Sequence, residues 1–254
     1  MADASESTYQ FPVIGVVHSC YRTKFGIPRQ SGLIREAVGE VELLPPYNQP
    51  NALRGIEEFS HLWLLFVFDQ NIRDGWKATV RPPRLGGDRR IGVFASRSPF
   101  RPAPIGLSAV RLEGIVTGGH GRLALKVSGL DLADGTPVLD IKPYLPYADI
   151  IPGATGGFAP DAPEEQALKV TFADAAEVKF RRLRPEFREL CRKVVSADPR
   201  PAYQRIPGRV YQCYLEEFEV LWQISEDDPM SAVIVDLNHL RGKAPVQPSR
   251  ASES

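Results

Sequence analysis

The sequence predicts a mainly β chain, with a small β-barrel amino-terminal domain followed by a smaller α+β carboxy-terminal domain. The first 150 residues hold seven short segments of alternating or continuous apolar residues, separated by turn signals. Sheets of short strands must close or stack to protect their edges, and we favour a barrel over a sandwich. The predicted strands cover residues 11–20, 39–44, 60–68, 91–96, 106–116, 123–130 and 138–143.

Residues 152–163 have the proline, glycine and alanine content of a linker or long loop, which makes them the best domain boundary. We therefore expect one domain at residues 10–155, a second at 165–240 and a mobile tail at 241–254. In the second domain, residues 168–172 favour a strand, and 211–224 and 232–237 alternate like paired strands. Residues 175–195 have helical spacing, with a break or a second helix start at Pro185. The expected inward positions of this helical span are Val178, Leu183, Phe187, Leu190, Cys191 and Val194.

Composition places the chain among globular proteins, since 43% of its 254 residues are hydrophobic and 24% are charged. Its first ten residues are polar and acidic and lack the pattern of a secretory signal. The longest apolar run, residues 62–68, is far too short to cross a membrane. Three widely spaced cysteines fit reduced thiols better than a disulfide framework or a zinc site. We therefore expect a cytoplasmic protein with no membrane segment and no metal.

Positive charge is concentrated in one region, although the chain has 31 basic and 31 acidic residues and no formal net charge. Between Arg73 and Arg101 there is a local excess of six positive charges in a stretch rich in loop residues. We call this region the basic strip. Its members are Arg73, Lys77, Arg81, Arg84, Arg89, Arg90, Arg97 and Arg101.

Common catalytic motifs are missing from the sequence. It has no Gly-x-Gly-x-x-Gly turn, no phosphate-binding P-loop and no His-Glu-x-x-His pair, which disfavours the usual nucleotide and metal folds. Its serines also lack the Gly-x-Ser-x-Gly setting of an esterase. Hydrolase chemistry therefore has no support.

Two loops carry unusual residue combinations. Residues 25–33 combine two glycines, a proline, Arg29 and Gln30, so their backbone amides can approach a ligand closely. Residues 97–104 contain three prolines, which favour a rigid path and aim Arg97 and Arg101 at an anionic or polarised ligand. The alternative in both cases is a structural surface loop with solvated arginines.

Acidic residues cluster near the end of the first domain. Asp134-Gly135 is a strong turn signal, so Asp134 is more often structural than catalytic. Asp140 and Lys142 have the same parity in one predicted strand and therefore lie on one face. They either project into a cavity or pair with each other on the surface, and the sequence alone favours the surface pair.

Taken together, these loops closely resemble the tRNA N6-threonylcarbamoyladenosine methyltransferase family. The resemblance rests on residues 29–33 (RQSGL), 55–63 (GIEEFSHLW), 81–87 (RPPRLGG), 92–107 with a Arg-Pro-x-Pro-Ile-Gly core, 134–137 (DGTP) and 140–144 (DIKPY). It spans roughly residues 11–149, and residues 198–203 (DPRPAY) extend it into the second domain. The family usually has asparagine in the Arg-Pro-x-Pro-Ile-Gly core, where this chain has Ala103.

This resemblance implies a small β-barrel that binds S-adenosylmethionine, a carboxy-terminal domain that helps to hold tRNA, and a homodimer with the cofactor near the subunit interface. It also implies methylation of N6 of N6-threonylcarbamoyladenosine next to the anticodon of tRNA-Thr. The cofactor contacts that it implies are Ser31, Gly32, Leu33, Asp69, Gln70, Arg97, Leu107, Ser128, Gly129, Leu130 and Asp131.

For the chemistry, we expect Arg97 to stabilise negative charge on the modified base and Asp131 or Asp140 to accept the N6 proton. The basic strip and the arginines of the helical span 175–195 are the expected contacts to the RNA backbone of the anticodon loop. A solvated helix face is the alternative for that span. Two other functions stay open, a non-catalytic RNA-binding β-barrel module and a cofactor-binding regulator.

Overall fold

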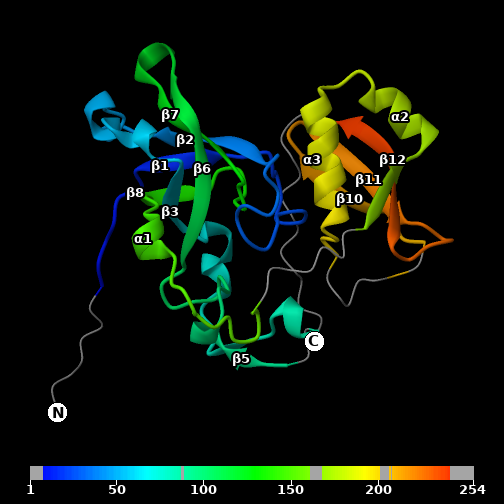
Figure 1. Cartoon of the computed structure of the whole chain (residues 1–254), viewed down its shortest axis with the longest axis horizontal. Coiled ribbons are helices and arrows are strands. Elements are labelled where there is room, and N and C mark those ends of the chain that lie inside the picture. The colour runs from blue at the N-terminus through cyan, green and yellow to red at the C-terminus, as the bar shows by residue number, and fades with distance from the viewer. Residues whose placement is uncertain (1–7, 87–88, 161–167, 201–205, 207, 241–254) are drawn as a thin grey trace.

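The amino-terminal strands form one closed sheet in the computed structural model, which describes residues 8–86, 89–160, 168–200, 206 and 208–240. The strand order is β1-β2-β7-β6-β3-β8, and the sheet is a closed barrel because β1 pairs with both β2 and β8 (Figure 1). All the pairings in this sheet are antiparallel. The strands are β1 (Gly15–His18), β2 (Val38–Leu43), β3 (His61–Val67), β6 (Ile105–Thr117), β7 (Leu123–Ser128) and β8 (Pro137–Pro143).

Strand β3 shows why this sequence forms the sheet. Its residues alternate between buried and partly exposed, and Leu62, Leu64 and Phe66 lie inside. Gly106 of the neighbouring β6 makes room for the inward Phe66, because a Cβ at position 106 would lie 2.2 Å from the Phe66 ring. The apolar run at residues 60–68 is therefore a strand, as predicted.

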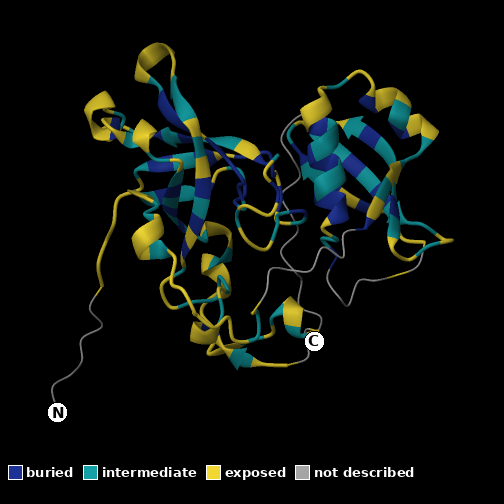
Figure 2. Ribbon diagram, in the orientation of Figure 1, coloured by how far each residue is buried: buried dark blue, intermediate teal, exposed yellow. Residues whose placement is uncertain are grey.

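A long excursion between β3 and β6 carries the basic strip. It contains a 3-10 turn at Asp69–Asp74, the short strands β4 (Thr79–Val80) and β5 (Ile91–Gly92), and further 3-10 turns at Pro83–Leu85 and Val93–Ala95. Most of this excursion is exposed (Figure 2). The strand predicted at 91–96 is wrong beyond β5, because the Ser96 hydroxyl donates to the Val93 carbonyl and closes a turn there. A short helix, α1 (Pro146–Asp149), follows β8.

The carboxy-terminal part is the small α+β unit that the sequence predicts. Its sheet has the order β10-β11-β12-β9, with β9 parallel to β12, and two helices lie on one face of it (Figure 1). Helix α3 begins at Pro185, as expected from the fixed φ of proline at a first helical position. Val178 is 55% exposed, so its predicted inward position is wrong. The elements are β9 (Lys169–Phe172), α2 (Asp174–Phe180), α3 (Pro185–Ser196), β10 (Tyr211–Leu215), β11 (Phe218–Ile224) and β12 (Ser231–His239).

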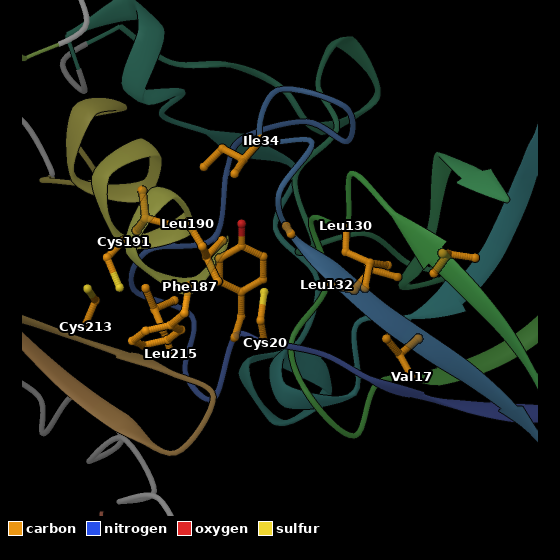
Figure 3. Close-up of a cluster of buried hydrophobic side chains, with 14 of the residues drawn as sticks. Val17, Cys20, Ile34, Leu130, Leu132, Phe187, Leu190, Cys191, Cys213 and Leu215 are labelled. Carbon is orange, nitrogen blue, oxygen red and sulfur yellow. The ribbon is translucent and has the colours of Figure 1, made fainter. Parts of the chain in front are cut away.

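The two parts share one continuous apolar core. Cys20 and Leu132 of the first part and Leu190 and Leu215 of the second belong to the same buried cluster (Figure 3). Residues 152–160 contain no helix or strand, in keeping with the predicted linker. The end of that linker and the tail predicted at 241–254 lie outside the described residues.

Candidate active site

A cleft of about 500 Å³ opens beside the barrel and collects residues from five separate segments of the chain. Residues 24–30, 66–71, 96–101, 105–108 and 131–136 all contribute to its wall. Its volume lies within the range of small-molecule sites. The cleft is therefore the candidate active site.

Asp131 is the carboxylate whose environment is most unusual. Its Oδ1 accepts a hydrogen bond of 2.7 Å from the hydroxyl of Ser108, a buried residue of β6. Burial raises the pKa of Asp131 from 3.8 to about 6, although hydrogen bonds from Ser108 and from the backbone amides of Asp131 and Ser31, and the charge of Arg97, oppose this shift. A carboxyl with a pKa near neutrality is suited to proton transfer.

The loop at residues 31–33 packs directly against the segment that leads to Asp131. The Gly32 amide donates to the Gly129 carbonyl at 2.9 Å. Gly129 has a φ of +73°, and a Cβ there would lie 3.2 Å from the Gly32 Cα, so a larger side chain would push the two segments apart. This contact places the Ser31 amide on the Asp131 carboxylate.

The two arginines of the proline-rich loop have different roles. The Arg97 Nη1 donates to the Gln30 Oε1 at 2.5 Å, which fixes the exposed guanidinium at the edge of the cleft. The Arg101 Nη1 instead donates to the carbonyls of Val93 and Ser96, at 3.1 and 2.7 Å. Arg101 therefore holds the shape of the loop, and Arg97 is the arginine available to a ligand.

Asp69 and Gln70 lie at the start of the 3-10 turn that follows β3, and both line the cleft. Lys24 crosses from the opposite loop and donates from Nζ to the Gln70 carbonyl at 3.2 Å and to the Asn71 Oδ1 at 3.0 Å. This pair of hydrogen bonds ties one wall of the cleft to the other.

Two family models together match most of this chain. The model described as the tRNA-methyltransferase O N-terminal domain matches residues 16–150, and the TrmO C-terminal domain matches residues 165–238. The chain belongs to the TrmO family. The family resemblance seen in the sequence is therefore confirmed.

Relatives of this TrmO chain include two bacterial proteins. The tRNA (adenine(37)-N6)-methyltransferase of Escherichia coli K12 is 48% identical over 225 residues, which cover 87% of this chain and 95% of the relative. A Pseudomonas aeruginosa protein, named among the S-adenosylmethionine-dependent methyltransferases, is 47% identical over 226 residues, with the same coverage of 87% and 95%. A crystal structure of TrmO from Pseudomonas aeruginosa aligns with a TM-score of 0.73 at 39% identity, covering 92% of this chain and 100% of that one.

The cleft of this TrmO chain gathers five of the residues expected to contact a cofactor, and two more flank it. Ser31 and Gly32 adjoin Asp131 and Gly129, as described above. Leu33 is 44% exposed outside the cleft lining. The five residues that line the cleft are Asp69, Gln70, Arg97, Leu107 and Asp131.

Ser128, Gly129 and Leu130 are buried and are not among the residues that line the cleft, so their role as direct contacts stays a prediction. Ser128 donates to Glu113, and Leu130 is fully buried in the core. Successive side chains of an extended segment point to opposite sides, so Leu130 faces the core where Asp131 faces the cleft. These residues support the cleft wall.

Asp140 lies outside the cleft lining, so the structure gives no support to its predicted role as a proton acceptor there. It lines a second hollow of about 350 Å³ with Ile14 and Leu43, and its Oδ2 lies 2.7 Å from the Lys142 Nζ. Thr136 lines the cleft. Asp140 comes four residues later along an extended strand, which places it about 13 Å from Thr136. The surface pair favoured by the sequence is the one observed.

Sequence reasoning missed Ser108 and Lys24. Ser108 occupies an inward position of β6 between the buried residues Gly106 and Val110. The available signal was therefore a polar residue at a strand position where the alternation calls for an apolar one. Lys24 precedes the loop at 25–33 and offered no signal. Ala103, the departure from the usual family motif, is exposed and outside the cleft lining.

The basic residues divide into two groups. In the helical span, Arg181, Arg184, Arg188 and Arg192 each form an ion pair with a glutamate, which favours the solvated-face interpretation of that helix. Within the described residues, none of the basic strip members forms an ion pair with a carboxylate. The strip therefore keeps its positive charge available.

Two further properties concern only the described part of the chain. Its helices include none with the length and apolar character that a bilayer crossing requires. Its His, Cys, Asp and Glu side chains form no group of three or more that would hold a metal ion.

The chemistry of the cleft fits S-adenosylmethionine, which has a sulfonium, an ammonium, a carboxylate and an adenine ring. Asp69 and Asp131 line the cleft and would supply negative charge for the two cations, and Lys24 and Arg97 would supply positive charge for the carboxylate. Phe66 and Phe68, with ring centroids 5.0 Å apart, give the cleft an aromatic wall. Each part of the cofactor therefore has matching groups.

Proposed function

We propose that this chain methylates N6 of N6-threonylcarbamoyladenosine next to the anticodon of tRNA-Thr, in the cytoplasm. As a member of its family, it is an S-adenosylmethionine-dependent tRNA adenine-N6 methyltransferase. The observation that carries the finer proposal is the cleft that brings Asp131, with a pKa near 6, together with Arg97. A carboxylate that accepts a proton and a guanidinium that stabilises negative charge together suit a nucleophile that must lose a proton beside a polarised carbonyl.

The cofactor supplies a methyl group on a positively charged sulfonium. The cleft residues Asp69, Asp131, Lys24 and Arg97 are the groups that would hold it. In-line transfer to nitrogen needs little covalent help, so alignment of the two reactants supplies much of the acceleration. The rigid loop held by Arg101 and the Gln70 turn held by Lys24 provide that alignment.

Asp131 accepts the N6 proton in this mechanism. In threonylcarbamoyladenosine, N6 lies between the purine and a carbonyl, which makes it a poor nucleophile but a more acidic N–H than that of adenosine. A carboxylate of raised pKa takes up such a proton more readily than an ordinary aspartate. The Ser108 hydroxyl and the Ser31 amide orient the carboxylate and keep enough of it ionised at neutral pH.

Arg97 stabilises the negative charge that develops on the carbamoyl oxygen as the proton leaves. Its guanidinium is fixed by Gln30 and therefore needs little reorganisation during the reaction. An adenosine beside the anticodon lies in a single-stranded loop and is not held in a duplex, which lowers the cost of bringing it to an open cleft.

The test is a methyl-transfer assay on purified tRNA-Thr with and without the threonylcarbamoyl group. We expect labelled methyl on the modified tRNA alone, and nucleoside mass spectrometry to place it on N6. A chain that binds tRNA without taking up S-adenosylmethionine would be an RNA-binding module. One that binds S-adenosylmethionine but methylates neither RNA would be a regulator.

We assign the RNA backbone contact to the basic strip. Changing Arg73, Arg81, Arg84 and Arg89 together to Gln should weaken tRNA binding and reduce the slope of log affinity against log salt by roughly three, since each lost phosphate contact removes about 0.7–0.9. Fluorescence anisotropy across salt concentrations measures both. The matched control changes Arg181, Arg184, Arg188 and Arg192 to Gln, with the same change in net charge. An equal loss of tRNA affinity in the control would assign the backbone contact to the carboxy-terminal domain as well. The tRNA-binding role of that domain stays a prediction.

We also propose that the chain acts as a homodimer. Large apolar side chains are exposed on the excursion between β3 and β6 and around α1, and a second copy would cover them. Light scattering should give twice the chain mass of 28.2 kDa, and Phe94→Asp should lower it. A wild-type mass of 28.2 kDa at micromolar concentration would contradict this proposal. The exposed residues are Ile72, Trp76, Phe94, Tyr147, Ile150 and Ile151.

A further inference from the structure

We propose that the carboxy-terminal domain positions one wall of the cleft, residues 24–30, and thereby sets the affinity for the cofactor. The positioning residues are Arg22 and Gly26. The inference rests on the proposed function, in which this cleft holds S-adenosylmethionine. It gives the carboxy-terminal domain a role in cofactor binding in addition to any contact with tRNA.

The chain enters this wall from the edge of the carboxy-terminal sheet. Tyr21 forms a β-bridge with Leu215, at the end of the edge strand β10. The Arg22 amide donates to the Tyr214 carbonyl at 3.1 Å, and the Glu216 amide donates to the Cys20 carbonyl at 2.7 Å. Residues 20–22 therefore extend the second domain's sheet although they belong to the first domain.

The Arg22 side chain links the two domains at the same place. Its Nε donates to the Glu216 carbonyl at 2.9 Å, and its Nη1 donates to the Asp134 carboxylate. Asp134 in turn accepts the Ser19 amide at 2.9 Å. Because Ala133 and Thr136 line the cleft on either side of this turn, Arg22 ties a second part of the cleft to the carboxy-terminal domain.

Gly26 packs the wall itself against the carboxy-terminal domain. A Cβ at this position would lie 3.4 Å from both the Cys213 Cβ and the Val194 Cγ1. Its φ of +98° is one that other residues rarely adopt. The loop glycine was expected to bring backbone amides to a ligand, and here Gly26 instead brings the loop to β10 and α3.

The wall has little structure of its own. Within the described residues 23–31, one backbone hydrogen bond is formed inside the segment, from the Ile27 amide to the Lys24 carbonyl at 3.4 Å. Its path therefore depends on what it packs against. Figure 3 shows Cys20, just before the wall, beside the core residues of the second domain. Gln30, at the far end of the wall, holds Arg97.

Loosening the attachment of residues 24–30 to the carboxy-terminal domain should weaken cofactor binding, because a smaller fraction of the molecules would hold the conformation that binds the cofactor. If Arg22→Ala lowers that fraction to about one-tenth, the apparent Kd rises about tenfold. Titration calorimetry with S-adenosylmethionine measures the Kd. Hydrogen exchange at the Ile27 and Gly32 amides, measured without cofactor, should become faster.

The matched control is Arg184→Ala. Arg184 also binds Glu216, through its carboxylate, but it lies within the carboxy-terminal domain, and among the described residues it forms no hydrogen bond to the cleft. We expect its Kd and its exchange rates to equal those of the wild type. Equal weakening in both variants would point to a general effect of the Glu216 turn and overturn the role of Arg22.

Gly26→Val is a second, independent test, with Gly55→Val as its control. Both glycines have a positive φ, of +98° and +83°, but only Gly26 has neighbouring atoms that a side chain would meet. We expect the Kd to rise for Gly26→Val alone. Circular dichroism establishes that each variant is folded, and Arg22→Ala carries the test if Gly26→Val is not.

Each outcome distinguishes the inference from the proposed function. If folded Arg22→Ala and Gly26→Val bind S-adenosylmethionine as tightly as the wild type does, the carboxy-terminal domain has no part in positioning the wall. If the wild type itself binds none, the proposed function fails instead.

Discussion

Asp131→Asn is expected to lower kcat for methyl transfer by about 10²–10⁴-fold, the usual contribution of a positioned general base. The amide keeps the size of the side chain and can still accept the Ser108 hydrogen bond, but it takes up no proton. The pH profile of the wild type supports the same role. Because Asp131 must be ionised to act, kcat/KM should rise with pH through the pKa of about 6.

The same substitution should not destabilise the chain at neutral pH. The pKa of Asp131 is raised from 3.8 to about 6 on folding, so between these values the folded state binds more protons than the unfolded state. Its ionisation therefore removes stability as the pH rises through this window, and asparagine removes that loss. Thermal unfolding at pH 7 should give a Tm for Asp131→Asn at or above that of the wild type.

Two further variants separate a base from a merely structural carboxylate. Ser108→Ala removes a hydrogen bond that favours the ionised form, so the rising limb of the profile should move to higher pH. Asp69→Asn, in the same cleft, should weaken cofactor binding but leave the rise of kcat/KM with pH centred near pH 6. An Asp131→Asn enzyme with wild-type kcat and an unchanged limb would remove Asp131 from the chemistry.

Arg97→Ala is expected to lower kcat by roughly 10²–10³-fold, as removal of one donor to a developing negative charge does in other enzymes. The guanidinium is exposed at the cleft edge and bound to Gln30, so its loss should leave the core intact. Steady-state kinetics at saturating tRNA and S-adenosylmethionine measure this effect.

The comparison of kcat with KM decides what Arg97 does. A role in charge stabilisation lowers kcat, whereas a contact to the cofactor alone raises KM for S-adenosylmethionine and leaves kcat unchanged. Arg97→Lys retains the charge but loses the planar fork, so it should recover part of the activity. An unchanged kcat in Arg97→Ala would limit this residue to cofactor binding.

Local pattern was enough to predict much of the architecture. A continuous apolar run located β3, proline chemistry located the start of α3 at Pro185, and the Asp134-Gly135 pair located a turn in which Gly135 has a φ of +83°. These features depend on neighbours a few residues away, so they can be read from the sequence. The strand predicted at 91–96 failed because a side chain, Ser96, competed for the backbone.

The candidate site was predictable only in part. The order of the loop motifs identified the family, and five of the residues implied by it line one cleft. The alternation of the strand showed only that Asp140 and Lys142 share one face. It left open whether they project into a cavity or pair with each other on the surface. Strand length decided it, because β8 carries Asp140 away from the cleft and beside Lys142.

By itself, the sequence determined the mainly β class, the two-part division and the family, because these depend on local periodicity and on motifs in a fixed order. Only the tertiary structure decided that Ser108, 23 residues away, hydrogen-bonds Asp131, and that Gly26 lies against Cys213 of the other domain. Such contacts join residues far apart in the chain. The raised pKa of Asp131 and the packing of Gly26 both arise from burial. Burial exists only once the sheet has closed and the two domains share a core.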